Sequence, residues 1–406
     1  MKLFLQDGAV IKNAEGKFMH LLDSPIRSEE LLVKTFGIKH RFYASSSEPL
    51  SHKELIELAE KNGDQDLIDL YNDHSLGYAE NSGSLDLRTE LATLYGPEID
   101  ADNIVVFPGA QTGMTLTTLS LLRPRDHSIV ITPSYQSLEE GIKIAGSDFT
   151  RVTLSPENNW QIDVAAIEAA IRGNTKYIVF NDPHNPSGSL MSAQTKKKLV
   201  ELAERHNILL FSDEVYRLLE LDPAMRSASV AELSENGIAL GTMAKPFGAG
   251  GTCIGWVACQ DMDIIEKLRK AQHIFAVCFA RAGEIQAMMV LRVREKIVEK
   301  NMNIIKENLV LLEDFFKENS DLFEWMPPQA GGTGFVKFKG PLTSDQLANE
   351  LLEQGILVFP SSIFDCDDDL KQYFRIGFSR RTMPAALEAF KEFVDERREI
   401  WGFPRT

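Results

Sequence analysis

Short apolar runs alternate with longer helical stretches through the middle of the chain, between about residues 104 and 256. The runs consist mostly of Val, Ile, Leu and Phe, with little alternation of apolar and polar residues. Continuous apolar runs of this length are typical of strands that are buried on both faces. We therefore expect an α/β unit with a mainly parallel central sheet flanked by helices, whose strands fall at residues 104–107, 128–131, 177–180, 208–211, 238–240 and 254–258.

The segments on either side of this unit follow a helical period for most of their length. Ser51 is a plausible N-cap, and a long helical region runs from about residue 262 to 318 with a break near 275–280. After it, short apolar runs and helices alternate in a smaller α+β unit. We predict three parts: an N-terminal segment, 1–75, that joins the small domain, a large domain, 76–290, and a small C-terminal domain, 291–406.

Composition excludes several classes of protein. The chain has 406 residues, is 44% hydrophobic and carries a formal net charge of −16. That charge has the wrong sign for a nucleic-acid or anionic-membrane partner, and no window is apolar enough for a membrane span. The four cysteines show neither zinc spacing nor a disulfide framework, so we expect no metal site and a cytoplasmic location.

Candidate functional residues follow the predicted strands, where ligands of parallel sheets bind. Gly109, Ala110 and Gln111 come after the first run and open a helix, whose free amides and dipole attract an anion such as phosphate. An ordinary capped helix start explains this segment equally well. The three consecutive lysines 196–198 fall in a predicted helix, and we expect a solvated face there.

Other strand ends carry side chains suited to a heteroaromatic cofactor. Tyr135 can stack on a flat ring, and the prolines around Asn185 fix the direction of its amide. Asp213, three residues before Tyr216, needs a cationic partner such as a protonated pyridine nitrogen if it is buried and charged. Lys245 lies in a glycine-rich turn; burial favours a neutral amine, which can form a Schiff base. Each residue alone also has an ordinary structural explanation.

In chain order, these segments resemble the class I/II aminotransferase family, the fold-type I enzymes that depend on pyridoxal 5'-phosphate. The resemblance covers roughly residues 43–395 and is carried by residues 78–88, 185–188, 212–216, 241–251 and 373–378. It implies that Lys245 binds the cofactor aldehyde and moves the substrate proton, and that Asp213 keeps the pyridine nitrogen protonated. It also implies an α-amino acid and a 2-oxo acid as substrates.

The resemblance implies roles for the remaining candidates as well. Asn185 and Tyr216 are expected to hydrogen-bond the ring's phenolic oxygen, Tyr135 to stack on the ring, and Arg375 to bind the substrate α-carboxylate. The expected phosphate ligands are Gly109, Ala110, Gln111 and Thr242, with Tyr78 contributed by a second subunit of a homodimer.

The sequence departs from the family pattern at Cys253, where an arginine that pairs with the phosphate usually stands. Loss of a charge-assisted pair weakens an anchor by about 1.5 to 3 kcal/mol. We hypothesise that Arg281, which in the resemblance projects towards the neighbouring subunit's phosphate, compensates; a helix-surface arginine is the alternative.

Two reactions remain open for such a site. The first is ping-pong transamination. The second is elimination, replacement or cyclisation of an amino acid, because residues 132–138, 183–188 and 45–47 resemble cyclases of the capreomycidine synthase type. In that reaction Glu48 or Glu80 would bind a cationic side chain. A pyridoxal-binding regulator is disfavoured by the acidic net charge and by the lack of a DNA-binding pattern before residue 43.

Overall fold

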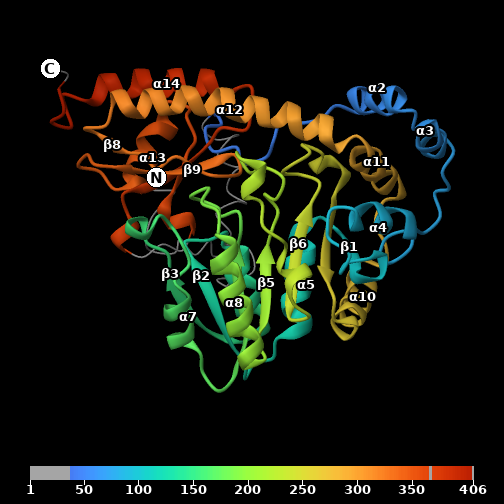
Figure 1. The fold of residues 1–406 in the computed structure, drawn as a ribbon. Coiled ribbons are helices and arrows are strands. Elements are labelled where there is room, and N and C mark those ends of the chain that lie inside the picture. Colours follow the sequence, from blue (N-terminus) through green and yellow to red (C-terminus); the bar gives the residue numbers. More distant parts are fainter. Residues whose placement is uncertain (1–36, 365–367, 405–406) are drawn as a thin grey trace, which may run out of the picture.

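The computed structural model describes residues 37–364 and 368–404, and its larger domain is built on a mainly parallel sheet (Figure 1). The strand order in the described chain is β1-β7-β6-β5-β4-β2-β3. β7 runs antiparallel to both of its neighbours, β1 and β6, and all other strand pairs are parallel. The predicted α/β architecture is therefore confirmed. The strands are β1 (Ile104–Pro108), β2 (His127–Thr132), β3 (Asp148–Thr153), β4 (Thr175–Asn181), β5 (Leu209–Asp213), β6 (Gly237–Thr242) and β7 (Ile254–Cys259).

The edge strand β3 was not predicted. It pairs with β2 in parallel, but its residues are polar and remain partly or wholly exposed. An edge strand with one open side does not need the continuous apolar run that marks the inner strands. A search restricted to such runs therefore finds the inner strands and the buried edge strand β1 but misses β3.

Helices cover both faces of the large sheet. One layer contains α5 (Ala110–Leu121), α6 (Ser137–Ala145) and α10 (Met262–Ala276), and the other contains α7 (Val164–Ala170), α8 (Ala193–His206) and α9 (Val230–Leu233). Because both faces are covered, the strands other than β3 bury almost every side chain, and the carboxyl ends of β4, β5 and β6 meet at one edge of the sheet.

The long helical region breaks where the sequence predicted. After α10, residues 277–280 interrupt the helix before α11 (Arg281–Arg292), and Val293 separates α11 from α12 (Arg294–Glu318). Upstream are α2 (His52–Asn62), α3 (Gln65–Asn72) and α4 (Leu85–Ala92). Ser51 caps α2 as predicted, since its hydroxyl accepts a hydrogen bond from the backbone N–H of Glu54.

The smaller domain contains an antiparallel sheet in the order β10-β11-β9-β8. Its strands are β8 (Phe323–Glu324), β9 (Thr333–Phe338), β10 (Phe359–Pro360) and β11 (Tyr373–Gly377), and its helices include α13 (Ser344–Glu353) and α14 (Met383–Arg397). Of the apolar run 356–359, only the last residue belongs to a strand, β10.

An early segment of the chain joins this small domain. The carbonyl of His40 accepts the N–H of Leu357, and the carbonyl of Phe42 accepts the N–H of Gly377. The small domain therefore draws on both ends of the described chain, as predicted, while the division of the chain at residues 75 and 290 stays a prediction. Among the described residues, no helix is both long and apolar enough to cross a membrane.

Lys196 corrects our expectation of a solvated lysine face. Its side chain is 4% exposed, and Nζ lies 2.8 Å from the Asp182 carboxylate and 3.2 Å from the carbonyl of Ala228. Lys196 shares the buried face of α8 with Leu199, Val200 and Ala203. The ion pair fixes α8 against the turn that follows β4.

We expect Lys196→Met to destabilise the protein strongly. Removing the lysine leaves the buried Asp182 carboxylate unpaired, which costs on the order of 3 to 5 kcal/mol of unfolding free energy. The matched control is Lys197→Met, because the Lys197 side chain is 77% exposed. Urea unfolding of the two variants measures the difference, and equal midpoints would contradict a structural role for the pair.

Candidate active site

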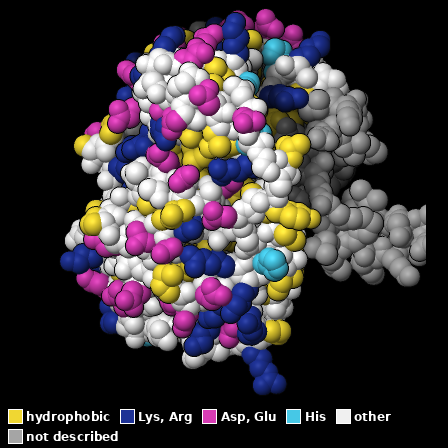
Figure 2. All heavy atoms as spheres, turned by 90° about the vertical axis from the view of Figure 1, so that its right-hand side faces the viewer, with side chains coloured by type: hydrophobic (Ala, Val, Ile, Leu, Met, Phe, Trp, Pro, Cys, Tyr) yellow, Lys and Arg dark blue, Asp and Glu magenta, His cyan; other side chains and the backbone are white. Residues whose placement is uncertain are grey.

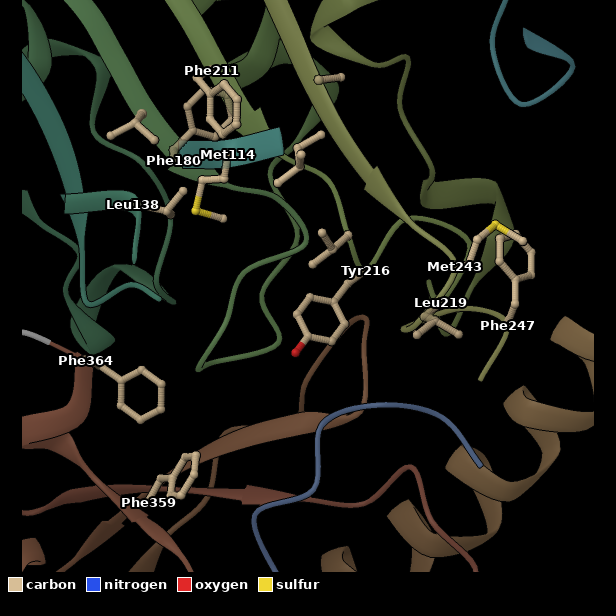
Figure 3. Packing of buried hydrophobic residues seen from close by; sticks show 14 of the residues in the cluster. Met114, Leu138, Phe180, Phe211, Tyr216, Leu219, Met243, Phe247, Phe359 and Phe364 are labelled. Atoms are coloured by element: carbon tan, nitrogen blue, oxygen red, sulfur yellow. The ribbon is translucent and has the colours of Figure 1, made fainter. Parts of the chain in front are cut away.

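A cavity of about 720 Å³ lies between the carboxyl-end edge of the large sheet and the small domain. The large domain contributes the start of α5, the ends of β5 and β6, and the turn after β6, while β10 and β11 line the cavity from the small domain. Figure 3 shows the Tyr216 hydroxyl pointing into the space that faces Phe359 and Phe364. The cavity thus lies where ligands of parallel sheets bind.

One end of the cavity suits an anion. Gly109 precedes α5 with a φ of 85°, and no side chain caps this helix, so its first amides are free of a side-chain acceptor. A Cβ at Gly255 would come within 2.3 Å of the Ala110 amide nitrogen, so β7 can pack closely on this turn only with a glycine. Thr242, at the end of β6, also lines the cavity. Free amides at a helix N-terminus fit a phosphate group.

Asp213 places a carboxyl group without a cationic partner at the end of β5. It is 3% exposed, and no Lys, Arg or His among the described residues lies within ion-pair distance. Burial raises its pKa to about 7, although the N–H of Val215 and the charge of Lys245 act in the opposite direction. A protonated ring nitrogen in the cavity would supply the missing positive charge.

Asn181 ties this acid to the turn that follows β4. Its side-chain amide donates to the carbonyl of Asp213, and its Oδ1 accepts the N–H of Asn185, both at 2.6 Å. The Asn185 side chain in turn accepts a hydrogen bond from Arg375 at 2.9 Å. Arg375 also donates to the carbonyl of Tyr43 at 3.0 Å. This series of hydrogen bonds connects the large sheet to the small domain.

The Lys245 amine lies in the same cavity. Nζ donates a hydrogen bond to the Ser45 hydroxyl at 3.1 Å and lies 5.5 Å from the centre of the Tyr216 ring. Tyr135 donates to Gln111 at 3.2 Å, and burial raises the pKa of the Tyr135 hydroxyl. The lysine, the two tyrosines and Asp213 therefore surround one space.

The cavity gathers most of the sequence-predicted residues: Glu48, Gly109, Ala110, Gln111, Tyr135, Asn185, Asp213, Tyr216, Thr242, Lys245 and Arg375. Tyr78 and Arg281 are not among them. Tyr78 is 89% exposed, and Arg281 forms an ion pair at 2.9 Å with the buried Glu284. Glu48 lines the cavity, but its carboxylate accepts a hydrogen bond from the N–H of Arg381.

Sequence reasoning missed other residues of the site. Ser45, Arg41 and Arg380 line the cavity, and Asn181 lies behind it. The first three are brought in by segments that approach from the small domain; residues 45–47 stand out in the sequence only for their resemblance to the cyclases, and no local pattern points to Arg41 or Arg380. Asn181 does end an apolar run, the same signal that identified Asp213.

This arrangement fits an enzyme that uses a phosphorylated pyridine aldehyde, because it offers an amine, a buried acid and an uncapped helix N-terminus around one space. The family model "Aminotransferase class I and II" matches residues 46–390, and the chain belongs to that family. It is a pyridoxal 5'-phosphate-dependent aminotransferase with the fold-type I architecture.

Similar proteins are consistent with this assignment. A probable aspartate aminotransferase of Methanocaldococcus jannaschii is 26% identical over 78% of this chain and 85% of its own length. The crystal structure of a PLP-dependent aminotransferase from Streptococcus suis superposes with a TM-score of 0.83, at 28% identity, over 93% of this chain and 98% of that one. N-succinyldiaminopimelate aminotransferase from Mycobacterium tuberculosis shares the fold, with a TM-score of 0.80 at 22% identity over 91% and 97% of the two chains.

We expect the cofactor-free protein to lose stability as the pH rises. The folded Asp213 carboxyl keeps its proton up to about pH 7, whereas the unfolded chain releases it near its ordinary pKa of 3.8. Unfolding is therefore increasingly favoured between these values, by up to about 4 kcal/mol at the upper end. Asp213→Asn removes this titration, so denaturation midpoints of the two apoproteins should diverge between pH 4 and 7; parallel profiles would contradict the buried acid.

Proposed function

We propose that the protein transfers the amino group of an α-amino acid to a 2-oxo acid in this cavity, with Lys245 as the catalytic base. The observation that carries the proposal is the presence of the Lys245 amine, the buried Asp213 carboxyl and the uncapped start of α5 around one cavity. An α-amino acid loses its Cα proton only if negative charge can be delocalised. Bound pyridoxal 5'-phosphate supplies the electron-accepting ring that does this.

Several residues of the cavity would hold the cofactor in place. Asp213 would pair with the ring nitrogen and hold its proton, because a buried carboxylate without a cation is unfavourable. Tyr135 would pack against the ring, and Asn185 and Tyr216 would donate hydrogen bonds to its phenolic oxygen. The phosphate would bind the first amides of α5, at Gly109, Ala110 and Gln111, together with Thr242.

Lys245 and Arg375 would act on the substrate. The Arg375 guanidinium, held by Asn185 and packed over the Phe359 and Phe364 rings, would bind the α-carboxylate. The Lys245 amine would take the proton from the substrate Cα and deliver it to the C4′ carbon of the cofactor. Ser45, which already accepts a hydrogen bond from this amine, would keep Nζ in place while it carries the proton.

Two features support a homodimer. Large apolar side chains are exposed in the segment that precedes α4 and at the C-terminal end of α10: Leu76, Tyr78, Ile274, Phe275 and Val277. The two segments meet, because the Asn81 side chain donates to the carbonyl of Val277 at 2.7 Å. Figure 2 shows apolar side chains among charged ones on the face where α3, α4 and α11 lie. A second copy would cover this surface and place Tyr78 and Arg281 next to a neighbouring active site.

A cytoplasmic location is also part of the proposal. Cys253, Cys259 and Cys278 are free thiols in the described chain, as expected for a protein kept in a reducing compartment. The alternative of elimination, replacement or cyclisation has less support, since the relatives named above are aminotransferases and Glu48 is engaged by the backbone of Arg381.

Incubation with single amino acids and no acceptor tests the reaction. We expect 2-oxo acid to appear in an amount equal to the enzyme, with no free ammonia, and turnover to continue only when a 2-oxo acid acceptor is added. Lys245→Ala should slow this release by about a thousandfold or more, whereas Lys197→Ala, on an exposed helix face, should not. Continuous ammonia production without an acceptor would instead identify elimination.

The missing phosphate arginine gives a further test. The start of α11 packs closely on residues 250–252 of the same chain, since a Cβ at Gly283 would lie 2.4 Å from the Thr252 carbonyl oxygen. If Arg281 supplies the missing charge across a dimer interface, Arg281→Ala should weaken cofactor binding about tenfold or more, and Cys253→Arg should restore it. Fluorescence titration of the apoprotein measures both, with Cys253→Ser and Arg281→Lys as controls. Unchanged affinity in Arg281→Ala would remove the idea.

A further inference from the structure

A buried imidazole that the proposed mechanism does not use joins two turns of the active site. His184 directly precedes Asn185 in the turn after β4, and it is 5% exposed. Its Nε2 lies 2.7 Å from the carbonyl oxygen of Pro133, in the turn after β2. That turn also contains Tyr135, two residues further along the chain. His184 therefore connects the turn of one cavity-lining residue to the turn of another.

The contacts of His184 fix which of its nitrogens carries a hydrogen. A carbonyl oxygen can only accept, so Nε2 donates to Pro133. Burial lowers the pKa of His184 to about 4, although the Pro133 carbonyl and the Asp182 charge act in the opposite direction. The ring is therefore neutral, and Nδ1 has no hydrogen. Nδ1 accepts from the Ser187 hydroxyl at 2.6 Å, whereas the hydroxyl of Ser189 lies further from that of Ser187, at 3.0 Å.

The backbone around His184 keeps the ring in this direction. The His184 N–H donates to the carbonyl of Ser189 at 2.9 Å, and its carbonyl accepts the N–H of Gly188 at 2.7 Å. Ser187 is held in the same turn, because its hydroxyl accepts the N–H of Ser189 at 3.1 Å. The imidazole thus has a hydrogen-bonded frame on one side and the Pro133 carbonyl on the other. A change in the distance between the two turns would break the contact with Pro133.

The backbone ladder between β2 and β4 ends before it reaches either turn. The last residues that pair are Val130 and Val179. Pro133 and His184 both lie beyond them in their own segments. The hydrogen bond from the imidazole therefore continues the connection between the two segments past the end of the ladder. The spacing of the two turns depends on a side chain at this point.

This spacing matters for two residues that are proposed to contact the cofactor ring from different directions. Tyr135 would pack against the face of the ring, and Asn185 would bond the phenolic oxygen at its edge. The Tyr135 hydroxyl is bonded to Gln111, while the backbone that carries Tyr135 is held by His184. On the other side, the Asn185 N–H is bonded to Asn181. A displacement of about 1 Å in a positioned group can lower a rate by about 100-fold.

We propose that His184 is a positioning residue whose Nε2–H holds the turn of Tyr135 at a fixed distance from Asn185. The face and the edge of the cofactor ring would then be contacted from one rigid frame, so the cofactor would be bound in one orientation. This inference rests on the proposed function, since that function assigns Tyr135 and Asn185 to the cofactor. His184 itself touches neither cofactor nor substrate in this role.

Two amide variants separate the Pro133 contact from the rest of the side chain. In His184→Gln the amide nitrogen can take the place of Nε2, whereas in His184→Asn the side chain is too short to reach Pro133. We expect the affinity of the apoprotein for pyridoxal 5'-phosphate to fall about tenfold in His184→Asn and less than about threefold in His184→Gln. Fluorescence titration measures this. His206→Asn, at an exposed residue that ends α8, is the control.

The holoenzyme gives two further readouts that a general loss of packing would not produce. In His184→Asn, kcat should fall by about 10- to 100-fold while KM for the amino acid changes less than about threefold, because Arg375 keeps its bond to the Tyr43 carbonyl. The pH midpoint at which the absorbance of the bound cofactor changes should shift by about half a unit or more, since bonding to its phenolic oxygen is disturbed. His184→Gln should retain most of both wild-type values.

Nitrogen NMR tests the protonation state of His184 without the cofactor. Comparison of the wild-type apoprotein with His184→Gln identifies the His184 signals among those of the eight histidines. We expect the Nε2–H tautomer, with no titration between about pH 5.5 and 8, because a charged imidazolium is unfavourable in this buried position. A midpoint close to the ordinary value of 6.5, or a hydrogen on Nδ1 alone, would overturn the proposal.

The remaining outcomes also decide the question. Equal losses of cofactor affinity in His184→Gln and His184→Asn would overturn the role of the Pro133 contact, and so would wild-type affinity and kcat in both. If His184→Asn does not fold, Ser187→Ala should weaken cofactor binding about threefold or more, and unchanged affinity there would contradict the proposal. If wild-type enzyme forms no 2-oxo acid from any amino acid, the proposed function fails, while cofactor affinity and NMR still decide the role of His184.

Discussion

A carboxyl group buried at the end of a central strand is the constraint on which this active site depends. Asp213 is surrounded by β4, β5 and β6 and has the Val215 N–H as a donor, which is too little to stabilise a full negative charge. Its pKa is therefore raised to about 7 when the cavity holds no cation. Burying this carboxyl group lowers the stability of the cofactor-free protein. The same group favours a ligand that brings a protonated nitrogen to it.

The acid also fixes the geometry of groups far from it in sequence. Asn181 bonds to the backbone of both Asp213 and Asn185, and Asn185 accepts a hydrogen bond from Arg375. Arg375 comes from the small domain and also binds the carbonyl of Tyr43. A displacement of the small domain would break these contacts, so the group proposed to pair with a ring nitrogen and the group proposed to bind the substrate are held in a fixed relative position.

Much of the fold was predictable because the inner strands are buried on both faces. Their continuous apolar runs marked the strand positions, and strand ends then marked Tyr135, Asn185, Asp213 and Lys245 as neighbours in space. The edge strand β3 was not predicted, because half of its residues are exposed to solvent and it has no continuous apolar run. The sequence contains a signal for the burial of Lys196, since this residue lies at helical spacing from Leu199, Val200 and Ala203. Its carboxylate partner, however, is fixed only by the tertiary fold.

Residues that depend on contacts between distant segments could not be predicted in this way. No local pattern predicts the contacts of Ser45 and Arg380, since Ser45 approaches Lys245 from 200 positions away and Arg380 is held by Ser46. Tyr78 and Arg281 are a different case: they were placed by resemblance to a family whose sites are shared between subunits. One chain leaves Tyr78 in solvent and pairs Arg281 with Glu284, so their predicted roles depend on a second copy.

The two domains use different physical means to attract anions. The large domain offers backbone amides at the start of α5, whose partial charges are fixed by the helix and need no side-chain ordering. The small domain and the early segment that joins it offer full charges, on Arg375, Arg380 and Arg41. Cys253 lines the same cavity as the start of α5, and its neutral side chain adds no charge to the backbone amides. In a chain with a net charge of −16, these arginines give the small-domain side of the cavity full positive charges, whereas the start of α5 offers only backbone amides.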